Sequence, residues 1–244
     1  MKPKIIVIII LLLSMLTTAC SSSRSSSDVT VDNPEINNPT VTVSPSSMPT
    51  ISPIVTISEK DLAMQAYKIV LQNEGDFIST DDNKKLLLND YLKEYLPGEQ
   101  LEVTHFTVID MDDDKIPEVV LELSISGISM YYEILHYNNE QIYGYNFVYR
   151  GLEQLKTDGT FWASGGAADN ECDKLIFDSS EYESVTLAYS ESKQDSDGMT
   201  ISYYVDGQPV TEEAFDSFVQ KQDAKDDVVW YELSQSNIEK ELEN

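Results

Sequence analysis

The hydrophobic residues of this chain fall into three differently patterned stretches. Near the N-terminus, apolar residues run without a break from Ile5 to Leu13. In residues 21–56, apolar residues are scattered among Ser, Thr, Asn and Pro. From Ser58 onward they recur with the periods of helices and strands. This division predicts a leader, an unpatterned spacer and one folded domain over residues 58–244, which is long enough for a core of its own.

Two helices are predicted at the start of the domain. Ser58 and Asp61 have the spacing of a capping box, and Gly75 is a suitable stop. The apolar stripe of this first helix is expected to be Leu62, Ala66, Ile69 and Val70. The second helix is predicted to begin after Ser79 or Thr80, with Asp81 and Asp82 in its first turn, and to end at Pro97-Gly98.

Beyond the second helix the hydrophobic period changes to two, which is typical of strands. In residues 118–125, Val119, Leu121 and Leu123 share one face, and Glu118 and Glu122 share the other. The predicted strands are 103–109, 118–125, 130–137, 141–149, 160–163, 174–177, 185–191, 199–205 and 228–233. Short turns between strands predict an α+β fold, in which N-terminal helices pack on a mainly antiparallel β-sheet and one or two short helices follow near the C-terminus.

The leader has the features of an export signal. Lys2 and Lys4 precede the apolar run, and Thr18, Ala19 and Cys20 follow it. The run is too short for a transmembrane helix, which needs about 20 apolar residues. The segment resembles the lipobox of bacterial lipoproteins. That resemblance implies a signal peptide over residues 1–19, cleavage before Cys20, and an acylated Cys20 held in the outer face of the bacterial cytoplasmic membrane. The alternative is an ordinary cleaved signal in which the cysteine is incidental.

The spacer is predicted to act as a tether. Six serines occur between positions 21 and 27, and five of the nine prolines of the chain follow before position 54. Such a composition does not bury enough apolar surface to fold, and proline favours extended conformations. Residues 20–57 are therefore expected to form a disordered, lipid-anchored tether that reaches on the order of 110 Å when extended.

Charge excludes one class of partner. The chain has 16 Lys and Arg against 43 Asp and Glu, a formal charge of −27, and removal of the leader lowers this to −29. A chain this acidic repels the phosphates of nucleic acids, so no nucleic-acid partner is expected.

The second cysteine is not expected to be reactive. If Cys20 carries lipid, Cys172 has no partner for an intramolecular disulfide. Its neighbours Glu171 and Asp173 disfavour the thiolate. The domain is therefore expected to depend on its hydrophobic core, because no disulfide constrains it.

One acidic loop has the spacing of a calcium site. Between two predicted strands, carboxylates stand at the first, third, fifth and ninth positions of the loop, and a backbone carbonyl stands at the seventh. The candidate ligands for Ca²⁺ are Asp110, Asp112, Asp114, the Ile116 carbonyl and Glu118. The loop resembles the D-x-D-x-D-G loops of FG-GAP-like and dockerin-like calcium modules, although Lys115 stands where those have Gly. The alternative is an acidic turn in solvent, and a bound ion is expected to brace the hairpin and not to catalyse.

Tyrosines on adjacent predicted strands are candidates for contacts with a ligand or partner. Tyr143, Tyr145 and Tyr149 belong to this group. Exposed aromatic rings stack on sugars or anchor a protein partner, whereas buried ones fill a core. Sequence alone leaves both alternatives open.

The order of segments 110–122, 143–170, 203–222 and 228–233 resembles uncharacterised lipoproteins of low-GC Gram-positive bacteria. That resemblance implies class and location but no activity. With neither H-E-x-x-H nor G-x-S-x-G in the chain, we expect a monomeric binding or interaction module for a protein or glycan rather than an enzyme. The alternative is a cell-surface glycan hydrolase that uses a pair of acids.

Overall fold

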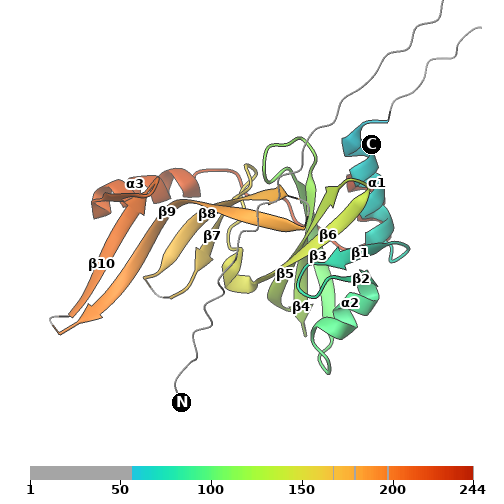
Figure 1. The fold of residues 1–244 in the computed structure, drawn as a ribbon, viewed down its shortest axis with the longest axis horizontal. Helices are drawn as coiled ribbons and strands as arrows, with labels where there is room; N and C mark the ends of the chain where they lie inside the picture. The colour runs from blue at the N-terminus through green and yellow to red at the C-terminus, as the bar shows by residue number, and fades with distance from the viewer. Residues whose placement is uncertain (1–56, 167, 179, 197, 244) are drawn as a thin grey trace, which may run out of the picture. The chain divides into compact units, whose positions relative to one another are not determined.

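The computed structural model describes residues 57–166, 168–178, 180–196 and 198–243 (Figure 1). The predicted signal peptide, Cys20 and all but the last residue of the predicted tether lie outside this part of the chain. The domain is a mixture of helices and strands, with more strand than helix, as an α+β fold predicts.

The strands form two sheets, where the sequence predicted one. Sheet A has the order β12-β3-β4-β5-β6-β1-β2, and sheet B has the order β11-β10-β9-β8-β7. All pairs of neighbouring strands are antiparallel except β1 with β6. The strands of sheet A are β1 (Asp76–Ser79), β2 (Lys84–Leu87), β3 (Leu101–Ile109), β4 (Glu118–Ile125), β5 (Ile128–Asn138), β6 (Gln141–Val148) and β12 (Tyr231–Glu232). Those of sheet B are β7 (Thr160–Ser164), β8 (Asn170–Asp178), β9 (Glu181–Asp195), β10 (Gly198–Val205) and β11 (Gln208–Val210).

The helices are distributed along the chain and are not gathered at its N-terminal end. They are α1 (Glu59–Leu71), α2 (Leu88–Tyr95), the short 3-10 helix η1 (Tyr149–Gly151), α3 (Glu212–Asp223) and α4 (Gln235–Glu241). Figure 1 shows α1 and α2 beside sheet A and α3 along sheet B, where α3 contacts β10. In the described residues, no helix is long and apolar enough to cross a membrane.

The start of α1 agrees with the sequence pattern, but its buried face does not. The Asp61 amide donates to Ser58 Oγ (3.1 Å) and the Ser58 amide donates to Asp61 Oδ2 (3.3 Å), so the predicted capping box is present. The predicted stripe is wrong for two of its four residues, because Leu62 and Ile69 are exposed. The buried face consists of Ala63, Met64, Tyr67, Val70 and Leu71. Tyr67 decides this orientation, since its hydroxyl accepts a hydrogen bond from the Tyr137 amide (2.7 Å) inside the core.

The second helix begins later than the sequence predicted. Residues 76–87 form the β1–β2 hairpin, and α2 starts at Leu88. Asp81 and Asp82 therefore lie in the hairpin turn and not in the first turn of a helix. The hairpin is stabilised by tertiary contact, because β1 pairs with β6 far along the chain. Such a pairing leaves no local signal.

Both faces of sheet A are covered, each by a different layer. On one face, Val119, Leu121 and Leu123 pack with buried residues of α1, α2 and α4. The alternation of apolar and polar residues along β4 predicted that the opposite face is polar. That face carries Val120, Ile134 and Tyr145. These three pack against side chains of sheet B in a second hydrophobic cluster; the sheet B residues are Phe161, Leu175 and Phe177. Two polar residues on that face of β4, Glu118 and Ser124, are consequently buried, and Glu122 is partly buried.

A buried carboxylate lies within the helix-side core of sheet A. Glu133 is 1% exposed, and its Oε2 accepts a hydrogen bond from the Tyr91 hydroxyl (2.5 Å). The side-chain Nδ2 of Asn146 also donates to Glu133 Oε2 (3.4 Å). Gly144 makes room for this carboxylate, because a Cβ there would overlap Glu133 Oε1 and the Phe77 ring. Burial raises the pKa of Glu133 to about 8, even though both hydrogen bonds act in the opposite direction.

This pKa predicts how stability changes with pH. Glu133 keeps its proton in the folded chain up to about pH 8, whereas the unfolded chain releases it above about pH 4.5. Its contribution is therefore complete below pH 4.5 and is lost as the pH rises through 8, by at most about 1.4 kcal/mol per pH unit. We expect E133Q to flatten the decline in urea midpoint between pH 5 and pH 8. E183Q, which removes an exposed carboxylate from β9, is the control, and parallel profiles for wild type and E133Q would contradict the assignment.

Candidate metal centre

The acidic loop connects two neighbouring strands, as predicted. Residues 110–117 join β3 to β4, and Ile109 pairs with Glu118 at the base of the loop. Asp113 (φ 67°) and Lys115 (φ 79°) both have left-handed backbone conformations, which let the chain reverse within a short loop. Lys115 therefore adopts the conformation that glycine would take at the sixth position of the resembled calcium loops.

Three of the predicted ligands come together. Asp110, Asp112 and Glu118 each offer one carboxylate oxygen, and these oxygens lie within 4.8 Å of one another. Asp110 and Asp112 are partly buried, and Glu118 is 0% exposed. Asp114 is outside this group, because its Oδ1 accepts a hydrogen bond from the Ile116 amide (2.6 Å) and its side chain is exposed. Participation of Asp114 and of the Ile116 carbonyl remains a prediction.

Hydrogen bonds within the loop orient the carboxylates. The Lys115 amide donates to Asp110 Oδ2 (3.0 Å), and the Asp114 amide donates to Asp112 Oδ1 (3.3 Å). These local bonds use one oxygen of each carboxylate. The other oxygen of Asp110 is buried and has no hydrogen-bond partner among the described residues. A buried carboxylate oxygen without a donor is costly unless a cation compensates for it.

Glu118 is held from two sides. The Met111 amide donates to its Oε2 (2.9 Å), and His136 Nδ1 lies 3.0 Å from its Oε1. His136 is itself buried, and its ring stacks on Phe177 of sheet B with centroids 4.8 Å apart. Burial raises the pKa of Glu118 to about 7, with a further increase from Asp112, while His136 and the Met111 amide act to lower it. The carboxylate is thus desolvated but fixed in position.

The same loop also contacts sheet B. The Phe177 amide on β8 donates to Asp112 Oδ2 (3.3 Å), and Lys174 on β8 forms an ion pair with Asp113. Gly159, just before β7, lies so close to the loop that a Cβ there would overlap the Met111 carbonyl. Its φ of +78° also favours glycine. The carboxylate cluster therefore lies where the two sheets meet.

Solvent reaches the outer side of the loop through a pocket. This pocket, of about 700 Å³, is lined by Asp110, Lys115 and Pro117 of the loop together with residues of α1 and α4. The α1 and α4 side adds the carboxylates of Asp61 and Glu241. This pocket gives a small cation an open route with more acidic than basic residues to Asp110, whereas the buried Glu118 is inaccessible to a large substrate.

The chemistry of the cluster favours a hard cation. Three carboxylates that converge in a partly desolvated loop provide oxygen ligands only, which is the preference of Ca²⁺ and Mg²⁺. The arrangement contains no nucleophile with an adjacent base, and its one histidine is buried behind Glu118. The site is better arranged to hold an ion than to act on a substrate.

The three candidate tyrosines have different environments. Tyr145 is 2% exposed and packs on Phe177 and Tyr182, so it fills the core and is not available to a ligand. Tyr143 is half-buried against the same core. Tyr149 is 45% exposed, and its ring stacks on Tyr132 (centroids 6.2 Å apart). Only Tyr149 presents a large part of its side chain to solvent.

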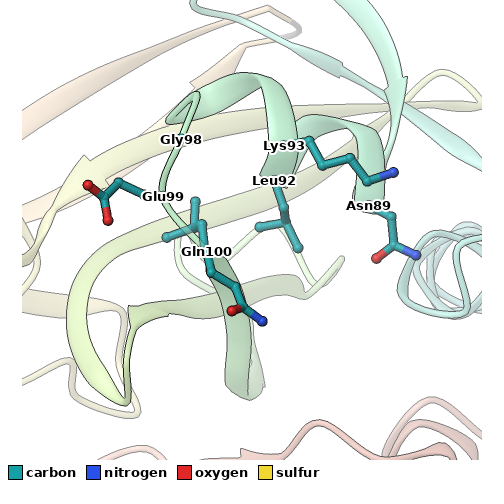
Figure 2. Close-up of a pocket in the computed structure, with 7 residues that line it drawn as sticks. Asn89, Leu92, Lys93, Gly98, Glu99 and Gln100 are labelled. Carbon is teal, nitrogen blue, oxygen red and sulfur yellow. The ribbon is translucent and has the colours of Figure 1, made fainter.

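Two other features carry no evident chemistry. A pocket of about 450 Å³ lies between α2 and the start of β3 (Figure 2). Its charged groups are Lys93, which pairs with Asp90, and Glu99, so no set of titratable groups converges there. Cys172 is buried, and burial raises its pKa to about 12, which agrees with the expectation of an unreactive thiol.

Sequence reasoning missed the residues that support the cluster. His136, Met111 and Phe177 belong to no calcium-loop pattern. Met111 lies within the loop itself, whereas His136 and Phe177 reach the site through the pairing of β4 with β5 and the packing of β8. The alternation along β5 does place His136 on the face opposite Leu135, but only the strand register brings it beside Glu118.

The chain matches no protein-family model, no curated protein and no solved structure.

The backbone at Lys115 yields a stability prediction. A non-glycine residue in the left-handed region destabilises the folded chain by about 1 kcal/mol or more, and substitution by glycine removes this strain. Glycine also makes the unfolded chain more flexible, which offsets part of the stabilisation. We expect K115G to raise the free energy of unfolding by about 0.5 kcal/mol, measured by urea denaturation in EDTA. K115A is the matched control, because it removes the same charge but retains the Cβ, and it should leave stability near the wild-type value. Equal stabilisation by both variants would assign the effect to charge.

Proposed function

We propose that this chain is a calcium-braced binding module, anchored by lipid on Cys20 at the outer face of a bacterial cytoplasmic membrane. The observation that carries the calcium proposal is the convergence of Asp110, Asp112 and Glu118 oxygens within 4.8 Å, at the point where the loop contacts both sheets. The leader, the proline-spaced tether and the acidic composition support the anchoring proposal.

The ion would act at the junction between the sheets, and not only within the hairpin. Asp112 is tied to β8 through the Phe177 amide, and Glu118 is tied to β5 through His136, which stacks on Phe177. An ion that binds Asp110, Asp112 and Glu118 would offset two of the three negative charges that these carboxylates bring together when ionised. Calcium concentrations outside a cell are high enough to fill sites with dissociation constants of about 10⁻⁴ to 10⁻³ M, which is the range of extracellular calcium-binding modules.

The burial of two acids with raised pKa values favours a binding role over hydrolysis. A glycosidase needs two carboxyl groups that both reach the substrate, separated by about 5–9.5 Å. Glu118 is 0% exposed and Glu133 is 1% exposed, so the two acids with the most strongly raised pKa values do not reach a glycan. No specific contact among the described residues favours the hydrolase alternative, and a binding module remains our proposal.

Calcium binding predicts a contrast between neighbouring aspartates. D112N removes a ligand charge from the cluster, whereas D113N removes the exposed partner of Lys174 in the same loop. We expect calorimetric titration in calcium-stripped buffer to give wild type a dissociation constant for calcium near 10⁻⁴ M. The dissociation constant of D112N should be roughly tenfold higher, and that of D113N should be close to the wild-type value. Calcium should also raise the melting temperature of wild type by mass action.

A local readout tests the position of the ion. Calcium should slow hydrogen exchange of the Phe177 amide, which donates to Asp112, more than that of amides at the far end of sheet B. The calcium proposal fails if wild type shows neither heat nor a melting shift at millimolar calcium. If binding occurs without added protection at Phe177, the ion braces the hairpin alone.

The anchor is tested separately from calcium. Cells that express the chain and are fed an alkyne analogue of palmitate should incorporate the label into wild type and not into C20S. C20S should also leave the membrane fraction, whereas C172S, which alters the buried cysteine, should keep both the label and the membrane location. Equal labelling of C20S and wild type would disprove the anchor.

A further inference from the structure

A second pocket lies on sheet B, far from the acidic loop in the chain and built from different elements. It has a volume of about 280 Å³ and is formed by β7, the start of β8, α3 and the segment before β7. Its lining residues include the aromatic residues Trp162 and Phe215, the acids Glu153 and Asp223, and the amide residues Gln154 and Asn170. The pocket thus combines an aromatic wall with negative charge.

The aromatic wall is fixed by packing. The Trp162 ring meets Phe215 edge to face (centroids 6.5 Å apart) and Phe218 at 90° (6.4 Å). Trp162 is half-buried against the small core cluster formed by Cys172, Ala188 and Phe215. Phe215 is itself buried, so Trp162 is the more accessible ring, and a ring packed in this way loses little further side-chain entropy on binding.

The two acids come from different elements, Glu153 from the segment before β7 and Asp223 from the end of α3. Glu153 is held beside Trp162 by two backbone hydrogen bonds, from its amide to the Trp162 carbonyl (2.7 Å) and from the Trp162 amide to its carbonyl (2.8 Å). Asp223 is the last residue of α3, where the helix dipole adds partial negative charge. An acid at this end of a helix is unfavourable, and Lys221, which is the basic residue of this last turn, forms no ion pair with it among the described residues.

Both carboxylates lack the partners that nearby acids have. Asp158 pairs with Lys225 (2.7 Å) and Asp227 pairs with Lys156 (2.6 Å). Among the described residues, the side chains of Glu153 and Asp223 form no ion pair and accept no hydrogen bond. Gln154 next to Glu153 also has a left-handed backbone (φ 53°), and such strain is common at ligand sites. Lys156 and Lys225 are thus used elsewhere, and Lys221 in the last turn of α3 forms no ion pair among the described residues, so neither carboxylate of the pocket has a cationic partner.

We propose that this pocket binds an organic cation, namely an alkylammonium group on a chain about as long as a lysine side chain. An ammonium group is attracted both to the face of an aromatic ring and to unpaired carboxylates, and its methylene groups suit the apolar wall. The volume is just below the range of about 300–1,000 Å³ that is typical of drug-sized ligands, which favours one side chain or one short amine. The net charge of −27 further attracts cations to the chain.

The inference gives a ligand class to the proposed binding module but depends on neither calcium nor lipid. It is therefore tested on the full mature chain with C20S, at low ionic strength and in EDTA. Calorimetric titration uses Nα-acetyl-lysine methylamide, the neutral isostere Nα-acetyl-norleucine methylamide, and the free amines 1,5-diaminopentane and spermidine. If the chain binds calcium and is lipidated but does not bind these amines, only the inference about the pocket is contradicted.

The expected result is a preference for the charged probe. The lysine amide should bind at least about tenfold more tightly than the norleucine amide, and added salt should weaken it. E153Q and D223N should each weaken binding roughly fivefold, because each removes one unpaired carboxylate. E183Q is the control and should bind as wild type does, since Glu183 is exposed on β9 some 20 Å along the sheet from the pocket.

The comparison of probes identifies the source of the ammonium group. Tighter binding of the lysine amide supports a basic side chain of a polypeptide, and tighter binding of spermidine supports a free polyamine. Quenching of Trp162 fluorescence in a W230F background provides a second readout that reports on the pocket even if a charge variant is destabilised. Equal affinity for lysine and norleucine amides, or no binding of any amine by a folded chain, would overturn the proposal.

Discussion

A fully buried carboxylate at the junction of two sheets imposes the strongest constraint on this structure. Glu118 begins β4, on the face of sheet A that sheet B covers. A desolvated acid requires donors or a cation, and here the Met111 amide and His136 supply the donors. The Met111 amide is supplied by the β3–β4 loop itself, whereas His136 depends on tertiary structure, since it comes from β5 and is stacked on Phe177 of β8. The loop, the strand register and the sheet packing therefore depend on one another through this side chain.

Negative charge is handled in three ways in the domain. Some exposed acids pair with lysines, as Asp227 does with Lys156. Glu133 is buried singly in a hydrogen-bonded network with Tyr91 and Asn146, where its raised pKa keeps it protonated near neutral pH. The third way is clustering, at the acidic loop and in the pocket beside Trp162, where carboxylates converge without enough cationic side chains. The proposed calcium ion and organic cation both follow from that shortage of internal cations, in a chain with a formal charge of −27.

The success of sequence reasoning depended on how local each signal was. Capping of α1 by Ser58 involves a neighbour three residues away, and the predicted cap is present. Strand β4 covers the same residues that alternation assigned to it. Errors arose where a distant partner decided the outcome. Tyr67 rotates α1 by bonding to β5, β1 forms by pairing with β6, and sheet B covers a face that alternation marked as polar.

The sequence by itself determined the positions of most strands, the acidic loop between β3 and β4, and the three-part organisation that predicts export and anchoring. These properties depend on spacing along the chain, so they can be read without coordinates. Only the tertiary structure decided that there are two sheets, that Asp110, Asp112 and Glu118 converge while Asp114 turns to Ile116, and that Glu153 and Asp223 share one pocket. The physical reason is that burial and convergence depend on contacts between residues tens of positions apart, which no local pattern encodes.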